Sequence, residues 1–151
     1  MTLEAKPVPV PAVGIVCFND DGNVLLIRRG NPPRQGEWSM PGGKLEWGEK
    51  AIDAAVRELF EETGVTAEIL GLIDVVDGIF TSRTNGDVTR HYVLIDYVAR
   101  YRSGKVAAGD DASEARFVAL ETLETYGLWN ETIRIIHAGH RLWRTAQTEQ
   151  T

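Results

Sequence analysis

Three glutamates lie about one helical turn apart near the middle of the chain: Glu58, Glu61 and Glu62. On a helix, positions i, i+3 and i+4 share one face. Like charges at this spacing destabilise a helix by about 0.2–0.5 kcal/mol per pair, and the helix dipole disfavours anions near the C-terminus. A hard divalent cation would remove this penalty, because Mg²⁺ and Mn²⁺ prefer oxygen ligands. The spacing indicates a metal site; a solvated acidic face is the alternative for this pattern taken alone.

The element that must position these acids is a helix followed by a glycine turn. We predict that it begins near Glu49 and ends at Thr63, with Gly64 as a left-handed C-cap. A helical wheel places the acids on one side and apolar residues on the other. We expect this apolar stripe to face the protein core: Ile52, Ala55, Val56, Leu59 and Phe60.

Two further features surround the acidic face. Arg57 precedes Glu61 by one turn and can hold a carboxylate in place through a forked ion pair. Glycines in the preceding loop allow the backbone to approach a ligand closely: Gly42, Gly43 and Gly48. Both features favour the metal site over a solvated face.

The whole segment resembles the signature of the Nudix (MutT-like) hydrolases, which would span residues 43–65 here. All of its defined positions match: Gly43, Glu49, Arg57, Glu58, Leu59, Glu61, Glu62, Gly64 and Val65. The resemblance implies an α/β fold, a Nudix-type α/β/α sandwich with a central mixed β-sheet. The signature would form a loop, a helix and a loop within it.

The resemblance also implies the ligands of a metal centre. Glu58, Glu61 and Glu62 match the metal-binding acids of the family, and the carbonyl of Gly43 is placed as a backbone ligand. The cofactor would be Mg²⁺ or Mn²⁺, with one to three ions. Such ions bridge phosphate oxygens, polarise phosphorus and lower the pKa of a bound water.

Four residues of the signature are the implied catalytic set: Glu58, Glu61, Arg57 and Glu49. Glu58 is also a candidate general base. Arg57 would orient the carboxylates without binding the metal itself. Glu49 lies nine residues before Glu58, about two and a half turns away, which favours a structural or auxiliary role.

Candidate substrate contacts lie outside the acidic face. Three arginines precede the glycine loop (Arg28, Arg29 and Arg34), and they could bind phosphates or project into solvent. Lys44 has the same two interpretations. Trp47 could stack on a base or pack against its own loop, and packing is slightly favoured.

The family often recruits an acid from outside the signature. Asp110, Asp111 and Glu114 are the candidates, in a loop before a predicted strand. For each of them a solvated turn is an equal alternative. Trp38 could form one wall of the site, although core packing is favoured.

The pattern along the chain predicts one domain over residues 1–151, with flexible ends at 1–8 and 145–151. Runs of apolar and β-branched residues predict strands. A short helix and turn should follow the last strand, and a helix capped by Asn130 should close the chain. The expected strands are 8–18, 24–29, 37–45, 65–76, 88–101 and 114–119, and the C-terminal helical segments are 120–128 and 130–143.

Composition narrows the function classes. A net charge of −6 argues against binding a nucleic-acid polymer, which needs a basic surface. The single cysteine, Cys17, cannot form an intramolecular disulfide, which fits a reducing compartment. The N-terminus has no apolar signal core, and no apolar run approaches the length of a membrane span. We therefore expect a cytoplasmic protein that binds no membrane, and the resemblance implies a small phosphorylated nucleotide as its substrate.

The implied reaction is attack of water on a phosphorus of a P–O–P linkage. The chain looks similar to the bacterial ADP-ribose pyrophosphatase-like group, so the expected substrate is a nucleoside diphosphate linked to another moiety. Dedicated ADP-ribose hydrolases tend to carry a proline where this chain has Ile79-Phe80-Thr81. A MutT-like nucleoside triphosphate pyrophosphatase is therefore the alternative, and a noncatalytic nucleotide-binding module is a remote one. The resemblance also allows a homodimer.

Overall fold

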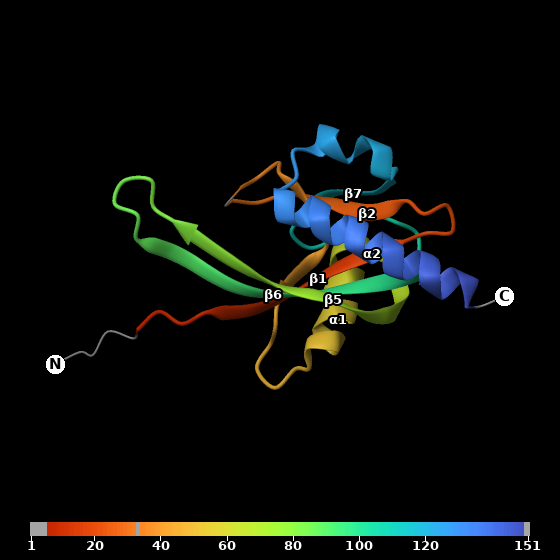
Figure 1. Cartoon of the computed structure of the whole chain (residues 1–151), viewed down its shortest axis with the longest axis horizontal. Helices are drawn as coiled ribbons and strands as arrows, with labels where there is room; N and C mark the ends of the chain where they lie inside the picture. Colours follow the sequence, from red (N-terminus) through yellow and green to blue (C-terminus); the bar gives the residue numbers. More distant parts are fainter. Residues whose placement is uncertain (1–5, 33, 150–151) are drawn as a thin grey trace.

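The computed structural model describes residues 6–32 and 34–149. One sheet joins seven strands of this part of the chain, and helices α1 and α2 cover its two faces (Figure 1). This arrangement confirms the predicted α/β class with a mixed sheet. The elements are β1 (Val10–Phe18), β2 (Val24–Arg29), β3 (Trp38–Ser39), β4 (Gly42–Lys44), α1 (Ala51–Thr63), β5 (Thr66–Thr81), β6 (Val88–Ser103), β7 (Ala112–Val118), the 3₁₀ helix η1 (Leu120–Tyr126) and α2 (Asn130–Thr148).

Strand β1 lies at the centre of the sheet and makes it mixed. It pairs in parallel with β6 along its whole length, from Val10 opposite Tyr92 to Phe18 opposite Arg100. It pairs antiparallel with β2 and with the short strand β4. Strand β7 adds to the far edge of β2, and β5 adds to the far edge of β6. The β1–β4 pairing fixes the loop before α1 against the sheet, and this positions the predicted site.

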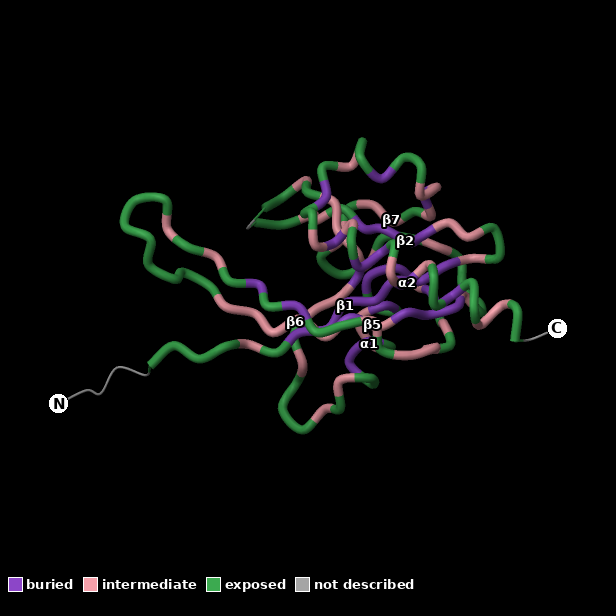
Figure 2. Tube along the Cα trace, in the orientation of Figure 1, coloured by how far each residue is buried: buried purple, intermediate pink, exposed green. Residues whose placement is uncertain are grey.

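The core divides between the two faces of β1, because successive side chains of a strand point to opposite faces. Val16 and Phe18 pack with Ile135, Ile136 and the rest of the cluster beneath α2. The alternate positions of β1 belong to the cluster beneath α1: Val13, Ile15 and Cys17. Figure 2 shows this buried zone in the body of the molecule, whereas the projecting end of the β5–β6 hairpin is mostly exposed. Cys17 is fully buried, and burial raises the pKa of its thiol to about 12.

Several element ends differ from the sequence predictions. Strand β5 continues to Thr81, where a loop was expected after Val76, because its backbone keeps pairing with β6 across the hairpin. Helix α1 begins at Ala51, since Gly48 has a positive φ of 80° and the backbone forms a turn there. Helix α2 runs through residues 145–148, where a flexible end was expected. The predicted ends at 1–5 and 150–151 lie outside the described residues.

The predicted core-facing stripe of α1 is confirmed at Ala55 and Leu59 and wrong at its other three positions. Ile52, Val56 and Phe60 are 43%, 40% and 56% exposed. The helix is rotated so that Ala54, Ala55 and Leu59 face the sheet. The two small alanine side chains let the backbone of α1 lie close to β1. The buried residues of α1 are Ala54, Ala55, Leu59, Glu62 and Thr63.

The prediction that Asn130 caps α2 is also wrong. Trp129 occupies the N-cap position, and no side chain makes a capping hydrogen bond there. Among the described residues, no helix is long and apolar enough to cross a membrane.

Candidate active site

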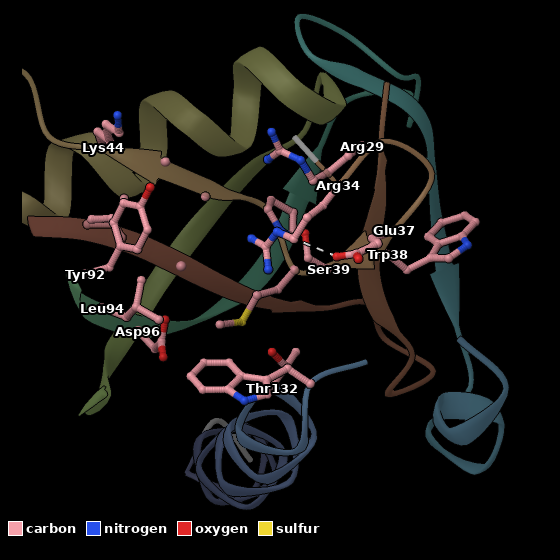
Figure 3. A pocket seen from close by; sticks show the side chains of 18 of the residues that line it. Arg29, Arg34, Glu37, Trp38, Ser39, Lys44, Tyr92, Leu94, Asp96 and Thr132 are labelled. Carbon is pink, nitrogen blue, oxygen red and sulfur yellow. Dashed lines mark ion pairs between the residues drawn. The ribbon is translucent and has the colours of Figure 1, made fainter. Parts of the chain in front are cut away.

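A cavity of about 400 Å³ opens between the loop before α1 and the start of α2 (Figure 3). The part nearest α1 is lined by Gly43, Arg29 and Lys44. The rest is lined by aromatic and apolar side chains, by the Asp96 carboxylate, and by Arg34 and Arg90, whose guanidinium groups lie over the ring of Phe80; the aromatic and apolar residues are Phe80, Tyr92, Leu94 and Trp129. The cavity therefore has one end suited to anions and one end suited to an aromatic group.

Arg57 organises the acids of α1. Its Nε and Nη2 donate to the two oxygens of Glu49 at 2.7 and 2.9 Å. Its Nη1 donates to Glu58 at 2.9 Å and to Glu61 at 3.1 Å. The hydrogen bonds from Arg57 lower the pKa of Glu49 to about 2. The guanidinium fork thus holds three carboxylates at once, and its Nη2 also reaches the carbonyl of Lys44 at 3.2 Å.

Glu62 is the buried acid of the site, with only 6% of its surface exposed. The backbone N–H of Gly42 donates to its Oε1 at 2.8 Å, which ties β4 to α1. Burial is the largest cause of a rise in the pKa of Glu62 to about 8, and the charges of Glu58 and Asp110 contribute to this rise. The hydrogen bond from Gly42 and the charge of Arg29 act in the opposite direction.

Glu58 lies against the backbone of Gly43. A Cβ added to Gly43 would lie 2.5 Å from the carboxyl carbon of Glu58, so a larger residue there would displace this carboxylate. Burial raises the pKa of Glu58, and Arg57 partly offsets this effect. The Gly43 backbone and the Glu58 carboxylate are therefore adjacent, as shared metal binding would require.

The acidic face fits a hard divalent cation. Within the described ranges, no three His, Cys, Asp or Glu side chains are already gathered as a metal site. Arg57 instead holds Glu58 and Glu61. The fit rests on charge, because Glu58 and Glu62 both have raised pKa values. The charges of Glu61 and Asp110 raise the pKa of Glu58, and those of Glu58 and Asp110 raise the pKa of Glu62. A cation among them would favour their ionised forms.

The three predicted arginines separate in the structure. Arg29 and Arg34 line the cavity. Arg28 instead donates from Nε to the carbonyl of Gly36 at 2.9 Å and lies 6.0 Å above the ring of Trp38. The β2–β7 register shifts between Arg28 and Arg29, and such a bulge redirects the side chains that follow it. The expectation that Arg28 contacts the substrate is therefore not supported.

The two tryptophans near the glycine loop lie in different environments. Trp47 is fully exposed and is not packed against its loop, so the favoured interpretation of this residue is wrong. Trp38 is half-buried and also lines the cavity. It packs edge-on against Tyr126 with ring centroids 5.1 Å apart. Trp38 therefore both packs against a neighbouring side chain and forms part of the wall of the cavity, as the two interpretations predicted.

The three candidate acids outside the signature also separate. The charge of Asp110 raises the pKa values of Glu58 and Glu62, so Asp110 lies beside the acidic face. Asp111 accepts a hydrogen bond from Asn31 at 3.0 Å, and Glu114 pairs with Arg116 at 3.1 Å. The candidate auxiliary acid that the structure brings to the site is Asp110.

Sequence reasoning missed Asp96, which lies on β6 and is 1% exposed. It lines the end of the cavity nearest α2, beside Leu94 and Thr132 (Figure 3). The available signal was a single aspartate within an otherwise apolar strand, at residues 93–98. A buried carboxylate in such a strand calls for a partner or a ligand.

Comparison with known proteins agrees with this geometry. The family model described as NUDIX domain matches residues 8–138. An ADP-ribose pyrophosphatase of Methanocaldococcus jannaschii is 36% identical over 82% of this chain and 70% of its own length. An RNA pyrophosphohydrolase of Novosphingobium aromaticivorans is 43% identical over 42% of this chain and only 39% of its own length.

A solved MutT NUDIX hydrolase from Burkholderia pseudomallei has the same fold, with a TM-score of 0.73 and 31% identity. The match covers 87% of this chain and 98% of that protein. The family match extends well beyond the signature and includes all the described strands and the first half of α2. The chain therefore belongs to the Nudix family and is a hydrolase of phosphoric anhydride bonds.

Proposed function

We propose that this chain cleaves the pyrophosphate bond of a nucleoside diphosphate linked to another moiety, of the ADP-ribose or nucleotide-sugar type. The observation that carries the proposal is the continuity of the cavity with the acidic face of α1. The cavity runs from Gly43, which touches Glu58, to an aromatic end suited to a base. The relative that covers most of this chain is named ADP-ribose pyrophosphatase, which favours the same substrate class.

In the proposed mechanism, the acidic face binds the metal and Arg57 positions two of its carboxylates. Glu58, Glu61, Glu62 and the carbonyl of Gly43 would hold one to three Mg²⁺ or Mn²⁺ ions. Bound there, the metal would polarise phosphorus and lower the pKa of the attacking water. Arg57 keeps Glu58 and Glu61 in position through its fork.

The chain's own groups would perform the remaining steps. Glu58, which lies against the Gly43 backbone, would accept the proton of the attacking water. Three cationic residues that line the cavity would neutralise the diphosphate and orient it: Arg29, Arg34 and Lys44. The P–O bond to the leaving phosphate then breaks, giving two phosphorylated products from an ADP-ribose type substrate.

A nucleoside triphosphate pyrophosphatase is the second candidate. Two observations favour it: the Burkholderia neighbour is named MutT, and residues 79–81 contain no proline. The same acidic face could cleave a triphosphate, because the metal recognises the anhydride and not the leaving group. The name of the Novosphingobium relative adds the triphosphate end of an RNA as a third substrate to test.

The test is a product screen on the purified protein with Mg²⁺, with products identified by mass spectrometry. Its substrates are ADP-ribose, nucleotide sugars, dinucleoside polyphosphates, standard and oxidised nucleoside triphosphates, and a 5′-triphosphorylated RNA. AMP plus a sugar phosphate supports the proposal, whereas a nucleoside monophosphate plus pyrophosphate supports the second candidate. Unchanged turnover in excess EDTA would refute the metal-dependent mechanism. If none of these substrates is hydrolysed, the result would favour a noncatalytic nucleotide-binding module.

Three broader proposals accompany the activity. We infer that residues 1–151 form one domain and that the protein acts in the cytoplasm, where its nucleotide substrates are found. A homodimer is also proposed, and size-exclusion chromatography with light scattering would test it directly. A monomer at micromolar concentration would contradict the dimer without affecting the proposed chemistry.

A further inference from the structure

Asp96 is a buried carboxylate that faces the cavity without a hydrogen-bond donor. It is 1% exposed, and its Oδ1 has no partner among the described residues. This oxygen lies against the Cα of Gly14 and near the end of Met40, where a Cβ on Gly14 would come within 2.3 Å of it. The sheet therefore makes room for the carboxylate at Gly14 but supplies no donor for it.

The charged groups around Asp96 do not satisfy it. Asp74 lies opposite Asp96 on β5 and carries the same charge. Arg134 on α2 directs its guanidinium to Asp74, at 3.4 Å, and to Glu131. Burial, with a contribution from Asp74, raises the pKa of Asp96 to about 7, and Arg134 opposes this rise. A buried acceptor in this position is most simply explained by a ligand that brings its own donor.

The side chains that line the cavity around Asp96 indicate the chemistry of such a ligand. Phe80 and Trp129 have ring centroids 6.0 Å apart, and both line the cavity with Tyr92 and Leu94. Flat aromatic groups stack on such side chains. Arg29 and Lys44 line the part of the cavity nearest α1, whereas Arg34 and Arg90 lie 6.0 and 5.3 Å from the ring centre of Phe80. A nucleotide placed with its phosphates beside α1 would bring its base toward Asp96 and Trp129.

We propose that Asp96 reads the substrate's base by accepting a hydrogen bond from the exocyclic amino group of adenine. The inference rests on the proposed function, because it assumes that a nucleotide occupies the cavity with its diphosphate beside α1. It adds a specificity-determining residue on β6 that lies outside the signature. The Asp96 carboxylate, which lines the cavity and has no donor at Oδ1 among the described residues, supplies the acceptor, and the aromatic lining supplies the stacking surface.

The test compares ADP-ribose with its analogue that contains purine in place of adenine and so lacks only the amino group. We expect wild-type kcat/KM to favour ADP-ribose by about 10- to 100-fold, the range for one hydrogen bond to a charged group. Asp96→Leu should bring this ratio close to one, mainly through KM. Asp96→Asn keeps an acceptor oxygen in the same shape and should retain most of the preference.

A second readout separates this inference from the proposed activity. Calorimetry on the metal-free protein would compare binding of AMP with that of purine riboside monophosphate, so no hydrolysis is needed. Preference for AMP that disappears in Asp96→Leu supports the inference even if ADP-ribose is not the substrate. Equal binding of the two nucleotides by the wild type, or a preference unchanged in a folded Asp96→Leu protein, would overturn it. Thermal unfolding of each variant establishes that it is folded.

Discussion

Glu62 and Asp96 are two buried carboxylates, one on α1 behind the backbone of Gly42 and one on β6 lining the cavity, and they differ in the hydrogen-bond donors that the fold gives them. Burial raises the pKa of both, to about 8 for Glu62 and about 7 for Asp96. Glu62 receives the N–H of Gly42 and lies among the other acids of the site. Asp96 has an unpaired Oδ1 and faces apolar and aromatic side chains.

The difference shows that a buried carboxylate can suit two kinds of ligand, depending on the groups around it. Removing a carboxylate from water is unfavourable in both places. At Glu62 the clustered negative charge suits a divalent cation, which interacts with several acids at once. At Asp96 a single acceptor in an apolar wall suits a neutral N–H donor. The predictions below test whether the two ends are separable in this way.

Loss of an acid at the α1 end should have the largest effect. Glu61→Gln or Glu62→Gln should lower kcat/KM by at least about 1,000-fold, because a bound metal supplies several kcal/mol of transition-state stabilisation. Steady-state kinetics with Mg²⁺ measures this loss. Asp53→Asn is the matched control, an exposed acid on the same helix that should change kcat/KM by less than about twofold. Unchanged hydrolysis in the two glutamine variants would show that the metal assignment is wrong.

The Asp96 end should make the stability of the metal-free protein depend on pH. The folded state raises the pKa of Asp96 from 3.8 to about 7, so it binds this proton more tightly than the unfolded state does. The stabilisation is complete below about pH 4 and is lost as the pH rises through about 7.

Asp96→Asn removes this titration. At pH 8 its free energy of unfolding should exceed that of the wild type by about 2–4 kcal/mol, and the difference should shrink toward pH 4. Urea denaturation in EDTA at several pH values measures the difference. A constant difference across this range would mean that Asp96 is not a strained carboxylate and would weaken the comparison with Glu62.

Gly43→Ala should damage the α1 end without unfolding the protein. The added Cβ would displace the Glu58 carboxylate, which is the far end of a flexible side chain. We expect kcat/KM to fall by about 10- to 100-fold, the range for disturbed support of metal ligands.

Gly48→Ala is the contrasting variant, because its added Cβ meets open space but its φ is 80°. It should reduce stability by about 1 kcal/mol and affect activity less than Gly43→Ala does. Thermal unfolding and kinetics on both variants separate the two effects. Equal activity losses would show that the loop as a whole matters, and not the contact between Gly43 and Glu58.

Trp47→Ala should have the smallest effect. Its side chain is fully exposed and does not line the cavity. Its free energy of unfolding should stay within about 0.5 kcal/mol of the wild type, and KM should change by less than about twofold. A large rise in KM for nucleotides, with kcat unchanged, would place the base at Trp47 and would contradict its assignment to the Asp96 end.

The sequence predicted the α/β class and the order of the helices and strands outside residues 37–45, because these depend on local patterns. Residues 37–45 were expected to form one strand but form β3 and β4, which pair with β2 and β1 respectively. The sequence also placed the three acids and Arg57 on one helix, and the structure brings Arg57 within 3.1 Å of Glu58 and Glu61. Their roles as metal ligands remain predictions. The extension of β5 to Thr81 was not visible, since a strand persists wherever its partner continues to pair.

The sequence by itself determined the spacing of Glu58, Glu61 and Glu62, since positions along one helix are fixed by its 3.6-residue period. Only the tertiary structure decided how that helix is rotated, and it buried Glu62 while exposing Phe60. Likewise, only the fold selected Arg29 over Arg28 and brought Asp96 into the cavity. The physical reason is that burial and distance depend on which elements pack together, whereas spacing within a helix depends on the backbone alone.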